Sequence, residues 1–249
     1  MPLFSNLPRV LFVANPNTTP PTVTTRRASK MTDDIDVIDD EGDVVFIVGT
    51  PKEKLKVSSV VLSRVSPVFK ALLGPHFREG QSERSSTQPV EINLPDDEPT
   101  AMTILLKMVH LKEFACFTNR AKICTKFLLE LAIVADKYDL VKKLRLQCHG
   151  LLLHWLFESP QENDITRQGR IIAASYILDQ PAVFEEVTGR FLRAMHPAAS
   201  VLLEETSGQR LPVTVLLALQ ERRSPSAQRG LCLKCVQEGA SIYTVCSKH

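Results

Sequence analysis

The stretch from Asp43 to Leu73, which reads DVVFIVGTPKEKLKVSSVVLSRVSPVFKALL, decides the fold. It opens with β-branched and aromatic residues at 44–48 and a turn at 49–51, which predicts a short, largely buried strand. Residues 53–57 then alternate charged and apolar side chains, which predicts a second strand paired with the first as a hairpin. After this hairpin the apolar residues recur three and four apart, so helices follow, and Ser66-Pro67 marks the start of the second one.

Farther along the chain the pattern continues to alternate between strand and helix. Residues 89–94 predict a short strand, and 95–99 supply a turn, a capping carboxylate and a first-turn proline for a helix that runs to about Leu111. Residues 112–123 fit a loop with a short strand around 114–117. Two further helices are predicted by apolar stripes, one around 127–135 and one that begins near Asp139 and reaches Trp155. The segment from 43 to about 157 is therefore predicted to contain both strands and helices.

The flanking segments differ from this central one. Residues 1–40 are predicted to form a disordered N-terminal tail, because 1–32 carry five prolines and six threonines and 33–41 is a run of acids. A mitochondrial transit segment is the alternative for 1–32, which hold four basic residues and no acid. Residues 158–221 predict a helical extension. Residues 222–249 form a basic tail that contains cysteine and histidine, and 222–231 fit a flexible link.

The composition narrows the classes of function that the chain can have. Hydrophobic residues make up 44% of the 249 residues and charged residues 23%, which are ordinary globular values, and a net charge of +2 gives no bulk indication of nucleic-acid binding. Six scattered cysteines and no recognisable secretory signal predict an intracellular protein of the nucleus or cytoplasm. No apolar run is long enough for a membrane span. Neither a phosphate-cradling glycine loop nor a hydrolase or metalloprotease motif occurs, so we expect no enzyme and no catalytic residues.

A metal-like pattern occurs only at the C-terminus. Two cysteines two residues apart can hold one face of a tetrahedral zinc ion, and a second Cys-x-x-His pair could complete the site. The candidate ligands are Cys232, Cys235, Cys246 and His249. The alternative, which we favour, is a tail whose cysteines bind no metal, so that the protein has no cofactor. If zinc does bind, the neighbouring arginines and lysine could contact phosphates, but only weakly and with strong salt dependence.

Four motifs in the central segment resemble a known family. Residues 62–69 read LSRVSPVF, close to the Leu-x-x-x-Ser-Pro-x-Phe of the BTB/POZ domain, and GPHFREG at 74–80 continues the match. INLPDDEP at 92–99 and ADKY at 135–138 complete it in the right order. The resemblance covers roughly residues 41–150 and is closest to fungal BTB-domain proteins. We set the domain boundaries at 41–157.

The resemblance implies a function in protein–protein interaction. The resemblance implies an α+β fold, a small sheet flanked by helices. Members commonly form homodimers through the first helix and the segment before the first strand, here 60–64 and 35–42. Members act as adaptors for cullin-type ubiquitin ligases, as transcription regulators or in channel assembly. We therefore expect an adaptor or scaffold that binds protein partners as a homodimer. The predicted interface residues are Asp43, Val60, Val61, Leu62, Arg64, Met102, Ile104 and Tyr138.

Two departures from the family pattern bear on the partners. A basic residue that faces the acid equivalent to Asp43 in many members is replaced by Ser59, so Asp43 would need another partner. The hydrophobic-x-Glu motif of cullin adaptors falls on Met102-Thr103-Ile104, which lacks the glutamate. A cullin stays a candidate partner, but the missing glutamate weakens the argument for cullin binding. A nucleic-acid-associated regulator with the C-terminal zinc site is the alternative function.

Overall fold

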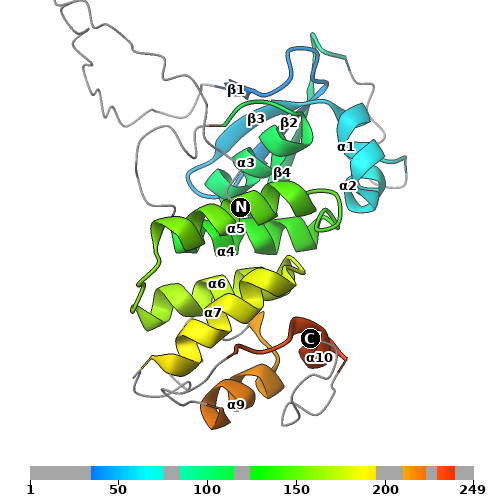
Figure 1. Cartoon of the computed structure of the whole chain (residues 1–249). Helices are drawn as coiled ribbons and strands as arrows, with labels where there is room; N and C mark the ends of the chain where they lie inside the picture. Colours follow the sequence, from blue (N-terminus) through cyan, green and yellow to red (C-terminus); the bar gives the residue numbers. More distant parts are fainter. Residues whose placement is uncertain (1–34, 76–84, 115–123, 195–209, 223–228, 239–249) are drawn as a thin grey trace, which may run out of the picture. The chain divides into compact units, whose positions relative to one another are not determined.

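A computed structural model of the chain describes residues 35–75, 85–114, 124–194, 210–222 and 229–238 (Figure 1). No helix within these ranges is both long and apolar enough to cross a membrane. The segment 1–34, with the transit alternative, and most of the expected strand at 114–117 lie outside the described residues.

A four-stranded mixed sheet forms one layer of the structure (Figure 1). The predicted hairpin is confirmed, because β2 (Val44–Val48) and β3 (Glu53–Val57) pair antiparallel. β4 (Val90–Leu94) lies parallel to β2 on one edge, and β1 (Ile35–Val37) lies parallel to β3 on the other. The strand order is therefore β1-β3-β2-β4.

The edge strand β1 was not predicted, and it lies in the segment that the sequence analysis assigned to the tail. All three of its side chains are exposed, so it lacks the alternation of buried and polar residues that identifies a strand. What holds it in place is tertiary: Asp36 accepts a hydrogen bond from Lys107 Nζ at 2.9 Å, and Ile38 just after the strand is buried. Residues 35–40, which the prediction placed in the tail, thus belong to the described fold.

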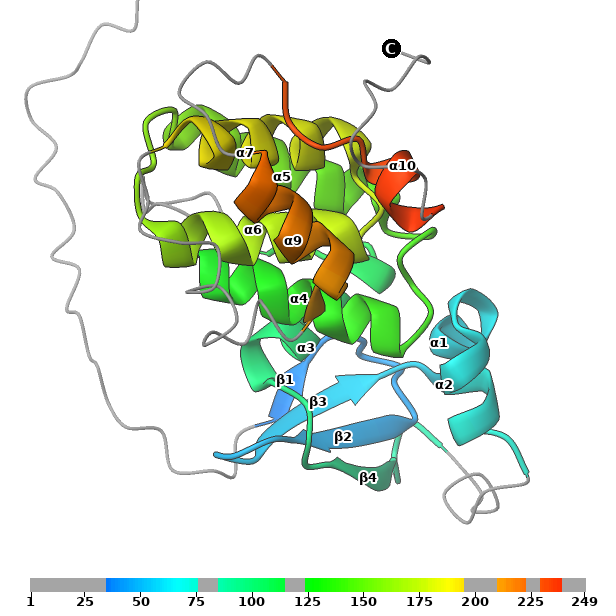
Figure 2. The same ribbon diagram turned by 90° about the horizontal axis from the view of Figure 1, so that it is seen from below.

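Helices pack against this sheet to complete a unit that we call the sheet domain, from β1 to α5 (Figures 1 and 2). Its helices are α1 (Ser59–Val65), α2 (Pro67–Leu72), α3 (Pro99–Val109), α4 (Thr125–Lys137) and α5 (Arg145–Glu158). Two predicted caps are confirmed. Ser66 Oγ accepts the N–H of Phe69 at 3.0 Å, and a carboxylate oxygen of Glu98 accepts the N–H of Ala101 at 2.6 Å.

α5 begins later than predicted. The apolar stripe from Leu140 placed the start near Asp139, but the helix starts at Arg145. Asp139 has a φ of 52°, which is left-handed backbone that ends α4 and prevents the helix from continuing. Leu140 and Leu144 are still buried, because the turns between the two helices fold onto the core. The periodicity therefore identified the buried residues correctly and the start of the helix wrongly.

The predicted helical extension follows. It contains α6 (Ile165–Ile177), α7 (Pro181–Arg193) and α9 (Val213–Glu221), and the structure adds α10 (Leu233–Gln237) within the segment predicted to be the tail. α6 packs along α4, and α7 packs on α6, so the extension continues the stack of helices away from the sheet (Figures 1 and 2). One apolar core runs through both parts and includes Phe46 of the sheet, Trp155 of α5 and Phe184 of α7.

Part of the segment predicted to be a flexible basic tail packs on α7. Leu231, Leu233 and Val236 are buried. The N–H of Leu231 donates to the hydroxyl of Thr188 at 2.8 Å. A side chain at Gly230 would collide with the carbonyl oxygen of Glu185, so only glycine allows this close approach. Residues 229–238 of the predicted tail are thus part of the folded extension.

Candidate interaction surfaces

The entry to β2 and the start of α1 are tied together by a carboxylate. Asp43 Oδ1 accepts the N–H of Ser59 at 2.7 Å, and Oδ2 accepts the hydroxyl of the same serine at 2.6 Å. The expectation that Asp43 needs a partner other than Ser59 is therefore wrong. A negative charge in this position also faces the amides at the N-terminus of α1, which stabilises the helix. Replacement of a basic residue by serine leaves the acid fully bonded within the domain.

A histidine that sequence reasoning did not assign to any site holds the same helix start. Nε2 of His110 accepts the N–H of Ser58 at 3.2 Å, and Nδ1 lies 2.8 Å from the carbonyl oxygen of Leu106, to which it donates. Burial lowers the pKa of His110 below its ordinary value, against the smaller opposing effect of the bond to Leu106. The neutral imidazole is the form that can accept from Ser58, so this contact is a structural link that depends on pH.

Tyr138 lies at the centre of the sheet domain. Its hydroxyl donates to Asp97 Oδ2 at 2.6 Å, its ring stacks on Phe69 with centroids 4.2 Å apart, and its carbonyl accepts the hydroxyl of Ser66 at 2.6 Å. Asp97 also accepts from Lys137 Nζ at 2.7 Å. Burial, followed by the bond to the carboxylate, raises the pKa of Tyr138 far above its ordinary value, so the phenol stays protonated. We call Ser66, Phe69, Asp97, Lys137 and Tyr138 the tyrosine hub.

The eight predicted interface residues fall into two groups. Leu62, Met102 and Tyr138 are buried in the core, where they pack within the chain itself. Val60 and Arg64 are exposed on α1, while Asp43, Val61 and Ile104 are partly buried. Only the residues of the second group offer surface to a partner in this conformation, and Val60 and Arg64, one helical turn apart, share a face of α1. Their role in an interface stays a prediction.

A cavity of about 720 Å³ lies between the sheet domain and the extension. Four acids of the sheet domain line one side, namely Asp96, Glu98, Glu130 and Asp136, together with the bound pair of Asp97 and Lys137. Tyr176, Ile177, Arg210 and Gln237 of the extension line the other side. Ile133, Val134 and Ile177 add apolar surface to these charged and polar walls.

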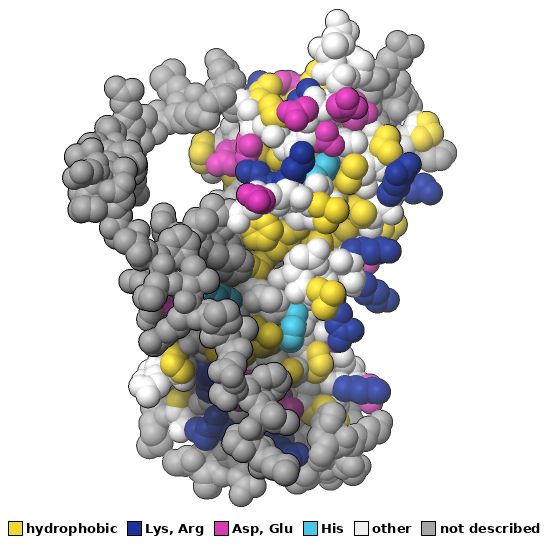
Figure 3. All heavy atoms as spheres, turned by 45° about the horizontal axis from the view of Figure 1, so that its top comes forward, with side chains coloured by type: hydrophobic (Ala, Val, Ile, Leu, Met, Phe, Trp, Pro, Cys, Tyr) yellow, Lys and Arg dark blue, Asp and Glu magenta, His cyan; other side chains and the backbone are white. Residues whose placement is uncertain are grey.

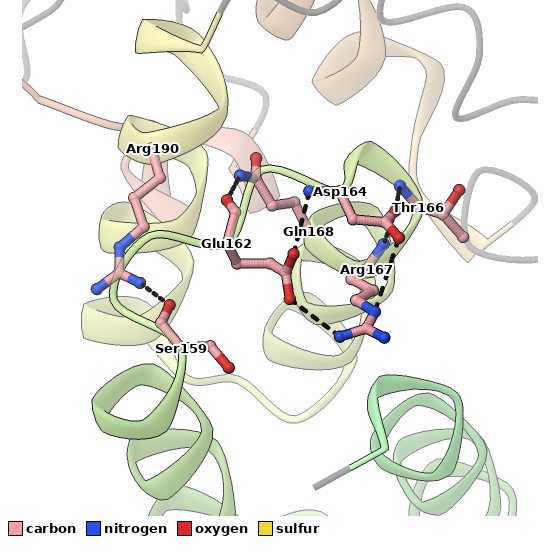
Figure 4. Close-up of polar contacts among 7 residues, drawn as sticks. All are labelled: Ser159, Glu162, Asp164, Thr166, Arg167, Gln168 and Arg190. Carbon is pink, nitrogen blue, oxygen red and sulfur yellow. Dashed lines mark hydrogen bonds and ion pairs between the residues drawn. The ribbon is translucent and has the colours of Figure 1, made fainter. Parts of the chain in front are cut away.

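The connection between the two parts is fixed by polar contacts around residues 159–168 (Figure 4). Asp164 caps α6 by accepting the N–H of Thr166 at 2.9 Å. Arg190 of α7 donates to the carbonyl oxygen of Ser159 at 2.9 Å, and the side-chain amide of Gln168 donates to the carbonyl of Glu162. Arg190 and Gln168 thus bind the backbone between α5 and α6. These bonds fix the path of the chain from α5 into the extension.

The proposed zinc ligands are only partly described. Cys232 immediately precedes α10 and Cys235 lies within it, both partly buried, whereas Cys246 and His249 lie outside the described residues. Over the ranges that the structure covers, no three side chains of histidine, cysteine, aspartate or glutamate gather as metal ligands. The zinc site therefore stays a prediction.

Comparison with known families agrees with the geometry. Residues 39–154 match the model of the BTB/POZ domain, a segment that includes β2, β3, β4 and the helices from α1 into α5. Comparison with curated proteins gives no match. The finer resemblance to fungal members stays a prediction. The mixed four-stranded sheet flanked by helices is the arrangement predicted from the sequence, and the chain contains a BTB/POZ domain at residues 39–154, followed by further helices.

Proposed function

We propose that this chain is a non-enzymatic adaptor or scaffold that binds protein partners through its BTB domain and pairs with a second copy of itself. BTB domains are generally protein–protein interaction modules. The observation that supports pairing is the exposed apolar surface on α1, where Val60 keeps 55% of its surface in solvent. Exposed aliphatic residues on a short helix gain free energy when a partner covers them, at roughly 25 cal/mol per Å² of apolar area.

The edge strand supports the same proposal. β1 presents the exposed side chains of Ile35 and Val37, and it lies at the edge of the sheet with one side unpaired among the described strands. An exposed apolar edge is a surface on which another chain can add. α1 and β1 are also the two segments through which members of this family commonly dimerise.

The oligomeric state of the full chain tests the pairing. Sedimentation equilibrium should show a dimer for the wild type and a monomer for Val60→Asp, because a charge at this position could not be buried at an interface. Leu217→Asp is the matched control, since Leu217 is an equally exposed aliphatic residue on α9. A wild type that is monomeric at every concentration would contradict the proposal, as would equal dissociation of both variants.

A cullin adaptor and a zinc-dependent regulator of transcription are the two finer alternatives. The structure adds no specific observation in favour of either, since Met102 is buried and two of the four candidate zinc ligands lie outside the described residues. Affinity capture of the tagged chain, followed by mass spectrometry and metal analysis, separates them. A cullin among the partners supports the first, and one zinc per chain supports the second.

A further inference from the structure

Four exposed basic side chains lie on α2, in the turns between α4 and α5 and at the start of α5. Lys70 is exposed on α2, Lys142 and Lys143 are exposed in the turns, and Arg145 is exposed at the first position of α5. The tyrosine hub brings these segments together, because residues 66 and 69 of the α2 start contact residue 138 just before the turns. We call Lys70, Lys142, Lys143 and Arg145 the basic surface. It was not identified from the sequence.

The charge of the basic surface is not neutralised by the part of the chain that the structure describes. None of the four side chains forms an ion pair with a described residue, whereas neighbouring Lys137 is bound to Asp97. Residues 58–73 contain no acid and residues 138–157 contain only Asp139. Figure 3 shows Lys and Arg side chains at several places along the right-hand edge of the molecule. Such a surface attracts an acidic ligand.

An apolar stripe begins at the edge of the basic surface. Leu146 follows Arg145 and is 81% exposed, and Phe157 on the same helix is 79% exposed. Leu146, Gly150, Leu153 and Phe157 are spaced four, three and four apart, so they share one face of α5. A side chain at Gly150 would meet no atom within 4 Å, which shows that this face is open among the described residues.

We propose that the basic surface and the apolar stripe together bind an acidic segment of a partner protein that also carries large apolar side chains. Carboxylates of such a segment pair with the lysines and Arg145, and its apolar side chains cover Leu146 and Phe157. A single-stranded nucleic acid would pair with the charges and could stack a base on Phe157, but it would leave the exposed Leu146 without a favourable contact. The inference rests on the proposed function of protein interaction, and it names the chemistry of the partner.

Fluorescence anisotropy with the full chain tests the proposal. The probes are a short labelled peptide of glutamates interspersed with leucine and phenylalanine, the same peptide with serine in place of its apolar residues, and a labelled single-stranded oligonucleotide of equal charge. We expect the first probe to bind most tightly and to weaken as the ionic strength rises. The triple variant Lys142→Glu, Lys143→Glu, Arg145→Glu should bind it at least about tenfold more weakly.

Two further variants make the result specific. Leu146→Ser combined with Phe157→Ser should weaken binding of the first probe severalfold. It should leave the affinity for the serine peptide unchanged. The variant Lys52→Glu, Lys112→Glu, Lys126→Glu makes the same change in net charge at exposed lysines outside the basic surface, and it should bind like the wild type. Circular dichroism of each variant confirms that the fold is retained.

Several outcomes would overturn the inference. These are a wild type that does not bind the first probe at low ionic strength, an equal loss in the control variant, and an oligonucleotide that binds as tightly as the peptide. Sedimentation of the same samples separates this failure from failure of the proposed function. A wild type that pairs with itself but ignores the peptide refutes only the acidic partner, whereas a monomer refutes the pairing.

Discussion

The BTB domain and the helical extension are held together by different kinds of contact. In the domain, the tyrosine hub joins side chain to side chain: the Tyr138 ring stacks on Phe69, and its hydroxyl bonds to Asp97. In the extension, Arg190 and Gln168 bond to backbone oxygens at the junction, and backbone packs directly on backbone at Gly230, although pairs of side chains such as Arg167 and Glu162 also bond there. Substitutions that remove side-chain atoms from the tyrosine hub should therefore destabilise the domain. A substitution that adds a side chain at Gly230 should release the C-terminal segment from α7.

The largest effect should come from an atom deletion in the hub. Phe69→Ala removes a fully buried ring that stacks on Tyr138 and lies 5.7 Å, centroid to centroid, from Phe46. We expect a loss of about 3–5 kcal/mol in the free energy of unfolding, measured by urea titration. Val68→Ala on the same helix, at a residue that keeps 37% of its surface in solvent, is the matched control and should cost far less. Equal losses in the two variants would contradict the role of the hub.

A single oxygen atom tests the polar half of the hub. Tyr138→Phe keeps the stacked ring but leaves Asp97 Oδ2 buried without the hydroxyl that it accepts. The expected loss is about 1.5–3 kcal/mol, because the bond joins a phenol to a charged group. Tyr176→Phe serves as the control, since no hydrogen bond to its hydroxyl appears among the described residues. If Tyr138→Phe left the free energy of unfolding unchanged, packing alone would hold the hub together.

Addition of one carbon tests the extension. Gly230→Ala should release residues 229–238 from α7, because the new Cβ would collide with the backbone at Glu185. We expect faster amide hydrogen exchange at Leu231 and easier proteolysis of this segment, with little change in unfolding of the BTB domain. Gly150→Ala is the opposite case, since its new Cβ meets open space in a helix and should be stabilising. An intact segment in Gly230→Ala would contradict the backbone contact.

The smallest effect should come from pH. The pKa of His110 is lowered in the folded state, so the unfolded chain binds more protons, and stability falls as the pH drops below the ordinary histidine value of about 6.5. The loss stops growing once the pH is below the folded pKa. Urea titrations at about pH 7 and about pH 5 should show this fall, and it should shrink in His110→Gln. If stability fell as much in His110→Gln as in the wild type, the pH dependence would come from other groups.

The sequence by itself determined the α+β class, the hairpin of β2 and β3, the caps at Ser66 and Glu98 and the helices of both parts. These features depend on local periodicity and on bonds between residues a few positions apart, and both can be read from the order of the residues. The family resemblance led to the choice of Leu62, Met102 and Tyr138 as interface residues, although the structure buries them. A motif shows that a residue matters to the fold, but it does not show whether the residue faces a partner or the core.

Only the tertiary structure decided the remaining features. β1 is a strand because β3 and Lys107 hold it, and α5 starts at Arg145 because the backbone turns at Asp139. Asp43 is satisfied by Ser59, sixteen positions away. The basic surface depends on the contact between residues 66 and 138, which holds the start of α2, the helix of Lys70, against the residue just before the turns of Lys142 and Lys143. Each of these features depends on residues that are distant in sequence and close in space, and a local pattern carries no information about such pairs.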